Sequence, residues 1–314
     1  MPRLRFLLSR AAAALVVIVT TTALTHAMLR VLRPDVFRGD EGPLIPSVVA
    51  FLGDVFIERD LGLAPSESNL PVMQVIVQGL PADVSLLAGA IALGVIGGAA
   101  GGIVAASRPR TLLARAVETA MALALIAPVY WVGLMLILVF APGVGGPFEF
   151  AAFSEPGTYQ PITRGPVAWL RSLIVPWIVL SLPIAALVAR MMRGSMAEVL
   201  DAEYLRTARA KGISEGAVLR RHALPAAASP VATVVGIYFA TFASNALLVE
   251  HVFGVPGVLR LTLRAAAIGD FQLLQGLVVV TAALVVLGTF LADAAAGFLD
   301  PRVRGGGAAL RLWR

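Results

Sequence analysis

Long stretches without Asp, Glu, Lys or Arg constrain the fold of this chain more than any other feature. Six of them hold at least 18 residues each: 11–29, 84–107, 119–148, 172–189, 223–249 and 271–292. A helix rises about 1.5 Å per residue, so each stretch can cross about 30 Å of hydrocarbon. The chain is only 14% charged, whereas soluble domains carry about 25%. The sequence therefore predicts an integral membrane protein.

The uncharged stretches favour helices over membrane strands. They lack the alternating segments of about ten residues that mark the strands of a membrane barrel, and a helix satisfies its own backbone hydrogen bonds in lipid. Residues 68–82 are also uncharged, but they hold several amides and prolines, and we interpret them as a lead-in to the second span. The predicted fold class is an all-α membrane protein with six transmembrane helices.

The predicted segments alternate between spans and the two sides of the membrane. In chain order they are a cytoplasmic N-terminus (1–10), the first span (11–31), an extracytoplasmic segment (32–80), the second span (81–107), the third span (116–141), an extracytoplasmic loop (142–171), the fourth span (172–192), a cytoplasmic loop (193–222), the fifth span with its lead-in (223–250), an extracytoplasmic loop (251–270), the sixth span (271–298) and a cytoplasmic tail (299–314). Because basic residues gather in the N-terminus, the two cytoplasmic loops and the tail, both termini are expected in the cytoplasm. An alternative interpretation, a cleaved signal peptide ending near Ala27, would leave five spans in the same orientation.

Missing residue types exclude several kinds of chemistry. The chain has no cysteine and three scattered histidines, so we expect no catalytic, cofactor-binding or metal site on it. A phosphate-cradling P-loop needs Gly-Lys-Ser/Thr, but the one lysine is Lys211, between Ala210 and Gly212. If the protein uses ATP, another chain must bind it.

The polar segment 191–222 interrupts the apolar sequence and lies on the predicted cytoplasmic side. Apolar residues return every three or four positions over 195–210, which predicts an amphipathic helix. Gly212 stands where a left-handed helix cap belongs, and Ser214 is a good N-cap for a second helix that begins with Glu215. We therefore predict a helix, a glycine turn and a helix.

This segment carries a resemblance to a known family. The stretch from Glu203 to Glu215, EYLRTARAKGISE, resembles the EAA loop of ABC-importer permeases, most closely those of the dipeptide, oligopeptide and nickel type. Further motifs stand in the order that this family shows: Asp60-Leu-Gly, Leu80-Pro81, Pro128-Val-Tyr-Trp-Val-Gly-Leu, Glu250-His-Val-Phe-Gly-Val-Pro-Gly and Leu299-Asp-Pro-Arg-Val-Arg304. The resemblance thus covers nearly the whole chain.

The resemblance implies a permease subunit without enzyme activity of its own. Its implied partners are a second permease, identical or similar, two cytoplasmic ATP-binding subunits that hold ATP and Mg²⁺, and an extracytoplasmic solute-binding protein. The implied location is the cytoplasmic (inner) membrane of a bacterium or archaeon. Transport would be of peptides or related small solutes, and the loop 193–222 would couple to the ATPases.

Specific residues take on roles through this resemblance. The EAA triplet corresponds to Arg206, Thr207 and Ala208, and the motif glycine to Gly212. The residues implied in ATPase coupling are Glu203, Tyr204, Arg206, Thr207, Ala208, Lys211, Gly212 and Ser214. The chain departs from the family at Asp83, where a threonine is common, and at Arg33-Pro-Asp-Val, where a Gly-Asp-Pro is usual. Both departures are external, so they bear on the solute and its receptor more than on coupling, and Asp83 can be interpreted as a cap of the second span.

Polar residues within the spans suggest a pathway lining. The candidates are Tyr130, Trp131, Thr241, Ser244 and Asn245, because polar groups at membrane depth face the bundle interior. Hydrogen bonding between helices is the alternative role. The acidic residues Glu250, Asp270 and Asp293 stand at predicted span ends, where they reach water, and we assign them no role in solute binding.

Two other features remain open to alternatives. The second span carries GxxxG spacings at Gly94 with Gly98 and at Gly97 with Gly101, which favour a close helix contact, although small lipid-facing residues are the alternative. For the function, the alternatives are an ion-gradient-driven secondary transporter or channel and a membrane-tethered DNA-binding regulator. For the polar segment 191–222, a merely structural cytoplasmic hairpin is the alternative to a docking element.

Overall fold

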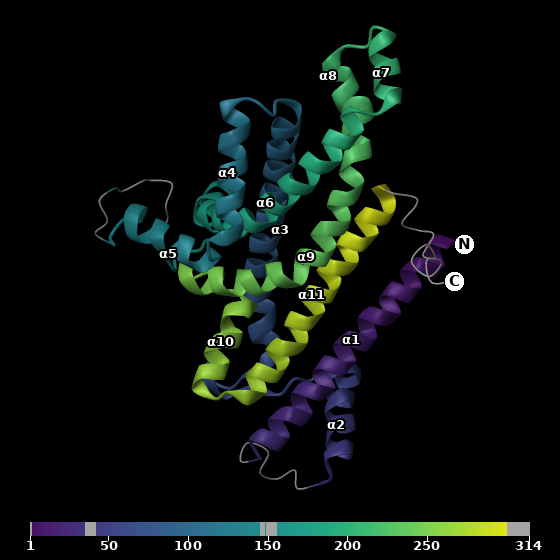
Figure 1. The fold of residues 1–314 in the computed structure, drawn as a ribbon. Coiled ribbons are helices and arrows are strands. Elements are labelled where there is room, and N and C mark those ends of the chain that lie inside the picture. Colours follow the sequence, from purple (N-terminus) through teal and green to yellow (C-terminus); the bar gives the residue numbers. More distant parts are fainter. Residues whose placement is uncertain (1, 35–41, 145–147, 149–155, 300–314) are drawn as a thin grey trace.

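The computed structural model describes residues 2–34, 42–144, 148 and 156–299 (Figure 1). Residues 1, 35–41, 145–147, 149–155 and 300–314 lie outside the described residues. They include parts of two predicted extracytoplasmic segments, most of the predicted tail and most of the Leu299–Arg304 motif. The helices are α1 (Pro2–Leu32), α2 (Leu44–Gly53), α3 (Val72–Ser107), α4 (Leu112–Ile126), α5 (Val129–Phe140), α6 (Pro166–Leu200), α7 (Glu203–Ala210), α8 (Glu215–Val218), α9 (Leu224–Phe253), α10 (Val258–Ile268) and α11 (Phe271–Leu299).

Short elements connect these helices. Single π-helical turns form η1 (Asp54–Glu58) and η4 (Leu219–Ala223), and 3-10 turns form η2 (Pro65–Glu67) and η3 (Ile162–Arg164). The strands β1 (Leu63–Ala64) and β2 (Leu70–Pro71) pair antiparallel, with Leu63 opposite Pro71.

The long helices confirm the predicted class of an all-α membrane protein. Within the described residues, five helices are long and apolar enough to span a membrane, and a sixth span results if α4 and α5 count as one. The axes of α4 and α5 meet at 107°, whereas the sequence predicts a continuous third span over 116–141. The break lies at Ala127 and Pro128, whose backbones are extended, because proline cannot donate the helical hydrogen bond and disfavours a helical residue before it.

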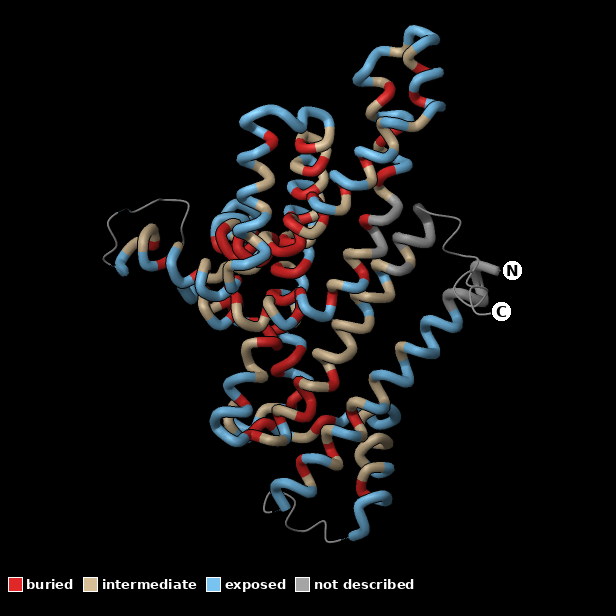
Figure 2. Tube along the Cα trace, in the orientation of Figure 1, coloured by how far each residue is buried: buried red, intermediate tan, exposed pale blue. Residues whose placement is uncertain are grey.

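The core of the bundle lies where α3 packs against α6, and Figure 2 shows buried residues concentrated there. Three glycines on one face of α3, at positions 94, 98 and 102, let the two helices approach. A Cβ on Gly98 would overlap the Ala185 carbonyl oxygen, and one on Gly102 would lie 2.6 Å from that of Ala189. Small residues permit such approach in membranes, so the first GxxxG spacing forms the predicted close contact.

The second GxxxG spacing behaves differently. Gly97 has no atom within 4 Å of an added Cβ, and Gly101 faces Val117 and Met121 of α4 at 3.2 and 3.3 Å. The α3–α6 contact therefore centres on Gly94, Gly98 and Gly102, whereas Gly97 faces open space and Gly101 faces mainly α4, with Ala189 of α6 at 4.0 Å.

Helix α1 is anchored mainly near its C-terminal end. His26 is 5% exposed; one ring nitrogen lies 2.9 Å from Gln275 Oε1 of α11 and the other 3.0 Å from Ser47 Oγ of α2. Its ring stacks on Phe51 at 4.4 Å between centroids. Apolar side chains such as Leu24 remain exposed along α1, as expected of a helix that faces lipid or another subunit.

The segments predicted to be extracytoplasmic contain more regular structure than the sequence predicts. Helix α3 already begins at Val72, so most of the predicted lead-in is part of the span, and the predicted loop 251–270 contains α10. Asp270 caps α11 by accepting from Leu273 N at 3.0 Å, and it also accepts from the hydroxyl of Ser66 at 2.6 Å. This carboxylate ties the first external segment to the start of the last helix.

The glycine contact between α3 and α6 generates a stability prediction. Gly98→Ala should lower the free energy of unfolding by about 1–3 kcal/mol, the usual cost of overpacking a tight contact, because the nearest atoms are backbone. Gly97→Ala is the matched control, one residue away on the open face, and should leave stability unchanged. Thermal unfolding of the purified protein in detergent measures both, and equal midpoints for the two variants would contradict the packing argument.

Candidate functional site

The predicted helix, glycine turn and helix form a hairpin at one end of the molecule (Figure 1). Helix α7 leads away from the bundle and α8 leads back toward α9 through η4. The sequence predicts one helix over 195–210, but this prediction is wrong: α6 continues to Leu200, and α7 starts anew at Glu203. The break is at Ala202, whose backbone is extended and whose carbonyl accepts from Leu205 and Arg206.

The turn at the tip has the predicted glycine conformation. Gly212 has φ of +76°, a left-handed value that residues with a Cβ adopt only at a cost. Its N–H donates to the Arg209 carbonyl at 2.9 Å, and the next N–H, of Ile213, donates to the Ala208 carbonyl at 3.3 Å. Ser214 is the N-cap residue of α8, although its side chain makes no capping hydrogen bond.

A bidentate ion pair braces the hairpin across the turn. Arg209 donates from Nε and Nη2 to the two carboxylate oxygens of Glu215, at 3.0 and 2.9 Å. This pairing lowers the pKa of the Glu215 carboxyl and raises the pKa of Arg209. Since the folded pKa of Glu215 is depressed, the stabilisation is present above its unfolded pKa and is lost as the pH falls through the folded value. At neutral pH the brace is intact.

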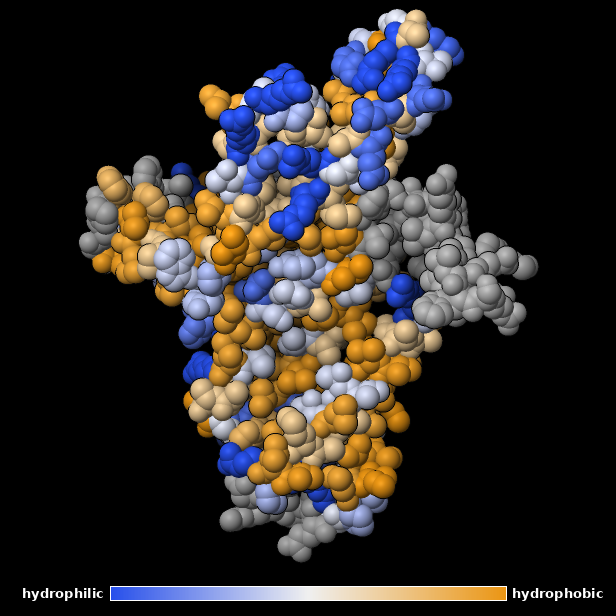
Figure 3. Space-filling model, viewed as in Figure 1, coloured by the Kyte–Doolittle hydropathy of each residue, from blue (hydrophilic) through white to orange (hydrophobic). Residues whose placement is uncertain are grey.

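The hairpin has a buried side and an exposed side. Leu205 and Val218 are fully buried and Ala208 is 9% exposed, and they join the main apolar core through residues such as Met196. Seven of the eight residues implied in coupling are exposed: Glu203, Tyr204, Arg206, Thr207, Lys211, Gly212 and Ser214. Figure 3 shows the tip as a hydrophilic surface beyond the apolar belt of the bundle. Ala208 therefore packs the hairpin onto the bundle and contributes little surface.

The candidate pathway residues lie on two helices that pack together. Helix α5 meets α9 at Gly133, where an added Cβ would lie 3.0 Å from the ring of Phe253. Tyr130 and Trp131 on α5 are about half exposed, at 44% and 51%. On α9, Thr241 and Ser244 are exposed and Asn245 is partly buried.

The hydroxyl of Ser244 donates to the Ala240 carbonyl of its own helix at 3.2 Å. That bond runs within one helix and does not link two helices, and the exposed positions on α5 and α9 leave both candidate groups accessible in this single chain.

Two buried carboxylates hold the start of α10. Asp83 of α3 accepts from the N–H groups of Val258 and Leu259, at 2.7 and 3.1 Å, and Glu250 of α9 accepts from that of Arg260 at 2.8 Å. Both side chains are fully buried. The first N–H groups of a helix have no partner within it and favour a negative charge, so the two acids join α3, α9 and α10 at one point, which we call the carboxylate clasp (Asp83 and Glu250 on the N-terminus of α10).

The carboxylate clasp corrects two interpretations from the sequence. Asp83 does not cap its own span but a helix 175 residues further along the chain, and Glu250 does not reach water. Gly257 is required beside Glu250, because an added Cβ would overlap its carboxyl group. The spacing of Glu250 and Gly257 in the sequence is a signal for this contact, but only the fold reveals Asp83 as its second member.

Comparisons with known proteins agree with this architecture. A family signature described as "binding-protein-dependent transport system inner membrane component" matches residues 98–305. The chain belongs to this family. It is a permease subunit of an ABC importer, which decides against the alternative of an ion-gradient-driven transporter or channel and against a DNA-binding regulator.

Relatives of the permease match over most of their length. A protein of Sinorhizobium fredii (strain NBRC 101917 / NGR234) named "probable peptide ABC transporter permease protein" is 36% identical over 89% of this chain and 86% of its own. The dipeptide transport system permease protein DppB of Haemophilus influenzae is 32% identical, over 81% of this chain and 79% of its own. The match thus extends beyond the signature on its N-terminal side.

A solved structure shares the fold of the permease. A chain of the MetNI methionine ABC transporter, in a crystal structure of inward-facing conformations, superposes with a TM-score of 0.54 at 18% identity, covering 73% of this chain and 97% of that one. At this identity the likeness concerns the fold alone.

The carboxylate clasp generates a prediction for the end of the permease that the sequence predicts to be extracytoplasmic. Asp83→Asn should lower the free energy of unfolding by about 1.5–3 kcal/mol, since an amide oxygen replaces a buried carboxylate that accepts two N–H groups. Hydrogen exchange at the start of α10 should accelerate, whereas exchange in the α7–α8 hairpin should not. The control is Glu58→Gln, an exposed acid of η1 on the same side; unchanged protection of α10 in Asp83→Asn would contradict the role of the carboxylate clasp.

Proposed function

We propose that this ABC permease imports peptides or related small solutes and receives its motion from separate ATPase subunits that dock on the α7–α8 hairpin. The exposed face of the hairpin would be the contact surface, with Glu203, Tyr204, Arg206, Thr207, Lys211, Gly212 and Ser214 on it, and Ala208 would position it. The hairpin end and both chain termini would then lie in the cytoplasm.

One observation carries this proposal: a small, internally braced hairpin projects from the apolar belt and is packed firmly onto the bundle on its other side. A soluble partner can bind the exposed side of the hairpin. When the partner moves, the buried residues of the hairpin transmit this displacement to α6 and α9. Small shifts of packed elements become larger rearrangements because packed interfaces have discrete arrangements.

The energy source would be ATP and Mg²⁺ bound on the partner chains. This chain offers no P-loop, and its one lysine stands on the hairpin turn. A complete importer would add a second permease, identical or similar, two ATP-binding subunits and an extracytoplasmic solute-binding protein in a bacterial or archaeal inner membrane. The peptide assignment rests on the names of relatives that match most of the chain.

The glycine turn supplies a test of coupling. Gly212→Ala places a Cβ on a residue with φ of +76° but meets no atom within 4 Å, so it strains the turn by about 1–2 kcal/mol without a clash. We expect several-fold lower peptide uptake and peptide-stimulated ATP hydrolysis by the reconstituted complex. Gly216→Ala, within α8 and equally uncrowded, is the matched control and should be as active as the unmodified complex. Equal activity of both variants would refute the role of the turn.

A second test asks which chain hydrolyses ATP. The purified permease alone should hydrolyse no ATP, whereas the complex with its ATPases and solute-binding protein should hydrolyse ATP faster when a peptide is supplied. ATP hydrolysis by the chain alone, with contaminating ATPases removed, would overturn the assignment to partner subunits. A complex stimulated by other solutes but not by peptides would overturn the peptide assignment and leave the coupling intact.

A further inference from the structure

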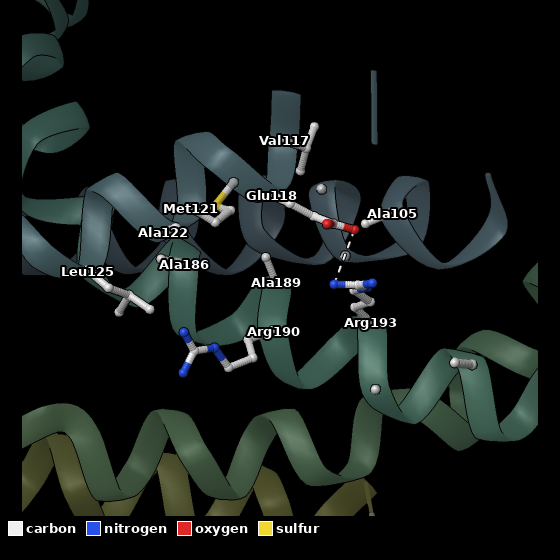
Figure 4. Close-up of a pocket in the computed structure, with 14 residues that line it drawn as sticks. Ala105, Val117, Glu118, Met121, Ala122, Leu125, Ala186, Ala189, Arg190 and Arg193 are labelled. Atoms are coloured by element: carbon white, nitrogen blue, oxygen red, sulfur yellow. Dashed lines mark ion pairs between the residues drawn. The ribbon is translucent and has the colours of Figure 1, made fainter. Parts of the chain in front are cut away.

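A cleft of about 370 Å³ opens between α3, α4 and α6 (Figure 4). Its base consists of small residues, among them Gly101 and Gly102 of α3 and Ala189 of α6, so few side chains fill it. Apart from Glu118, its wall on α4 is apolar and includes Met121 and Leu125. The volume lies in the range of about 300–1,000 Å³ that is usual for small-molecule sites.

An ion pair crosses the part of the cleft nearer to the hairpin. Arg193 Nη1 of α6 lies 3.1 Å from Glu118 Oε1 of α4, and Figure 4 shows the two side chains pointing toward each other. This pair neutralises one of the two arginines that line the cleft. The net charge of the lining is therefore that of the other, Arg190.

Arg190 has a different environment. Its guanidinium is exposed and makes no hydrogen bond or ion pair with any residue in the described part of the chain. In Figure 4 it turns away from the ion pair, toward the side of the cleft where Leu125 and Ala186 lie. Helical side chains point toward the N-terminus of their helix, and for α6 that direction leads into the apolar run 172–189.

Arg190 stands near the end of the predicted fourth span, where its charge meets water or an anion. Arg190 directly follows 18 residues without charge on α6, and Leu125 of α4 lies in the uncharged run 119–148. Arginine at membrane depth pairs with an anion or lines a water-filled cavity, and it marks solute pathways. Its planar guanidinium matches a carboxylate with two parallel hydrogen bonds.

We propose that Arg190 binds the free carboxylate of the transported solute in this cleft. The inference rests on the proposed function, because a peptide always carries such a group at its C-terminus unless it is modified. The apolar wall of α4 accepts side chains without hydrogen-bonding demands, so the site recognises the carboxylate and tolerates different residues beside it. Since α6 runs on from Arg190 to the hairpin, displacement of the hairpin moves the bound carboxylate.

The test compares two solutes that differ only in this group. Radiolabelled trialanine and its C-terminal amide are offered to the complete reconstituted complex, carrying Arg190, Arg190→Gln or Arg190→Lys. We expect the preference for the carboxylate over the amide to fall about tenfold in Arg190→Gln, as for loss of a hydrogen bond between charged groups. Arg190→Lys should retain part of it, and uptake of the amide should not change.

The ratio of the two uptakes isolates the permease, because any preference of the solute-binding protein is the same in every variant. Arg110→Gln is the matched control: it removes an arginine from the exposed turn between α3 and α4, outside the cleft lining. An unchanged ratio in Arg190→Gln would overturn the inference. The inference would also be overturned if uptake of both solutes fell equally and the loss depended on the anionic lipid content of the vesicles, since Arg190 would then bind a lipid phosphate. Loss of assembly with the second permease would overturn it as well, since Arg190 would then form a subunit contact.

A photo-cross-linking measurement covers the case of a solute-binding protein that rejects the amide. With benzoylphenylalanine in place of Leu125, illumination of the intact complex should cross-link radiolabelled trialanine to the permease. Arg190→Gln should reduce this cross-linking about tenfold, whereas Arg110→Gln should not. Absence of labelling in a complex that transports trialanine would refute the site alone. A complex that transports no peptide at all would instead refute the proposed function.

Discussion

The close contact between α3 and α6 is the interaction on which the remaining structure depends. Lipid is as apolar as the side chains, so helix association in a membrane rests on packing and polar contacts rather than on the removal of apolar surface from water. Glycines at positions 94, 98 and 102 let backbone lie against backbone, and Trp177 of α6 fits over Gly89 while its indole N–H donates to the Ser85 carbonyl at 2.9 Å. Helix α4 packs against this pair on one side and α9 on the other. The cleft at Arg190 lies between α3, α4 and α6, and it exists because its base on α3 and α6 has no large side chains.

Charged groups organise both ends of an otherwise apolar bundle. At one end, the two acids of the carboxylate clasp accept from the first N–H groups of α10, and Asp270 accepts from an N–H group at the start of α11. On the other side the pairing of Arg209 with Glu215 fixes the angle between two short helices that could not remain helical alone, since isolated helices of this length are marginal in water. Buried acids are tolerated because each one meets donors that would otherwise be unsatisfied, and the exposed brace needs no such compensation.

The features that follow from local sequence could be predicted, and those that depend on distant partners could not. Uncharged runs reveal the spans, and Gly212 followed by Ser214 reveals the turn, because both depend on neighbouring residues. The bend at Pro128 is not predicted, because proline is tolerated within membrane helices and the size of a bend depends on packing. Asp83 looked like the cap of its own helix, since nothing in the sequence brings it beside Val258. Likewise the pairing of Glu118 with Arg193, which singles out Arg190, joins residues on different helices. The end of α6 at Leu200 was missed because the apolar period continues through it.

The length of α6 has a mechanical meaning. With 35 residues it extends about 52 Å, well beyond the roughly 30 Å of hydrocarbon. Near its start, the hydroxyl of Ser172 accepts from Gln160 N at 3.3 Å, and its end at Leu200 lies two residues before α7. Pro176 and Pro183 lie inside this helix, where proline leaves a helical hydrogen bond unmade and favours a bend. The segment from Pro183 to Leu200, about 26 Å long, can still work as a lever: rotation by about 10° around Pro183 carries its far end through about 4–5 Å, close to the rise of one helical turn. The displacement at the hairpin is thus set by the length of α6 that follows its second internal proline.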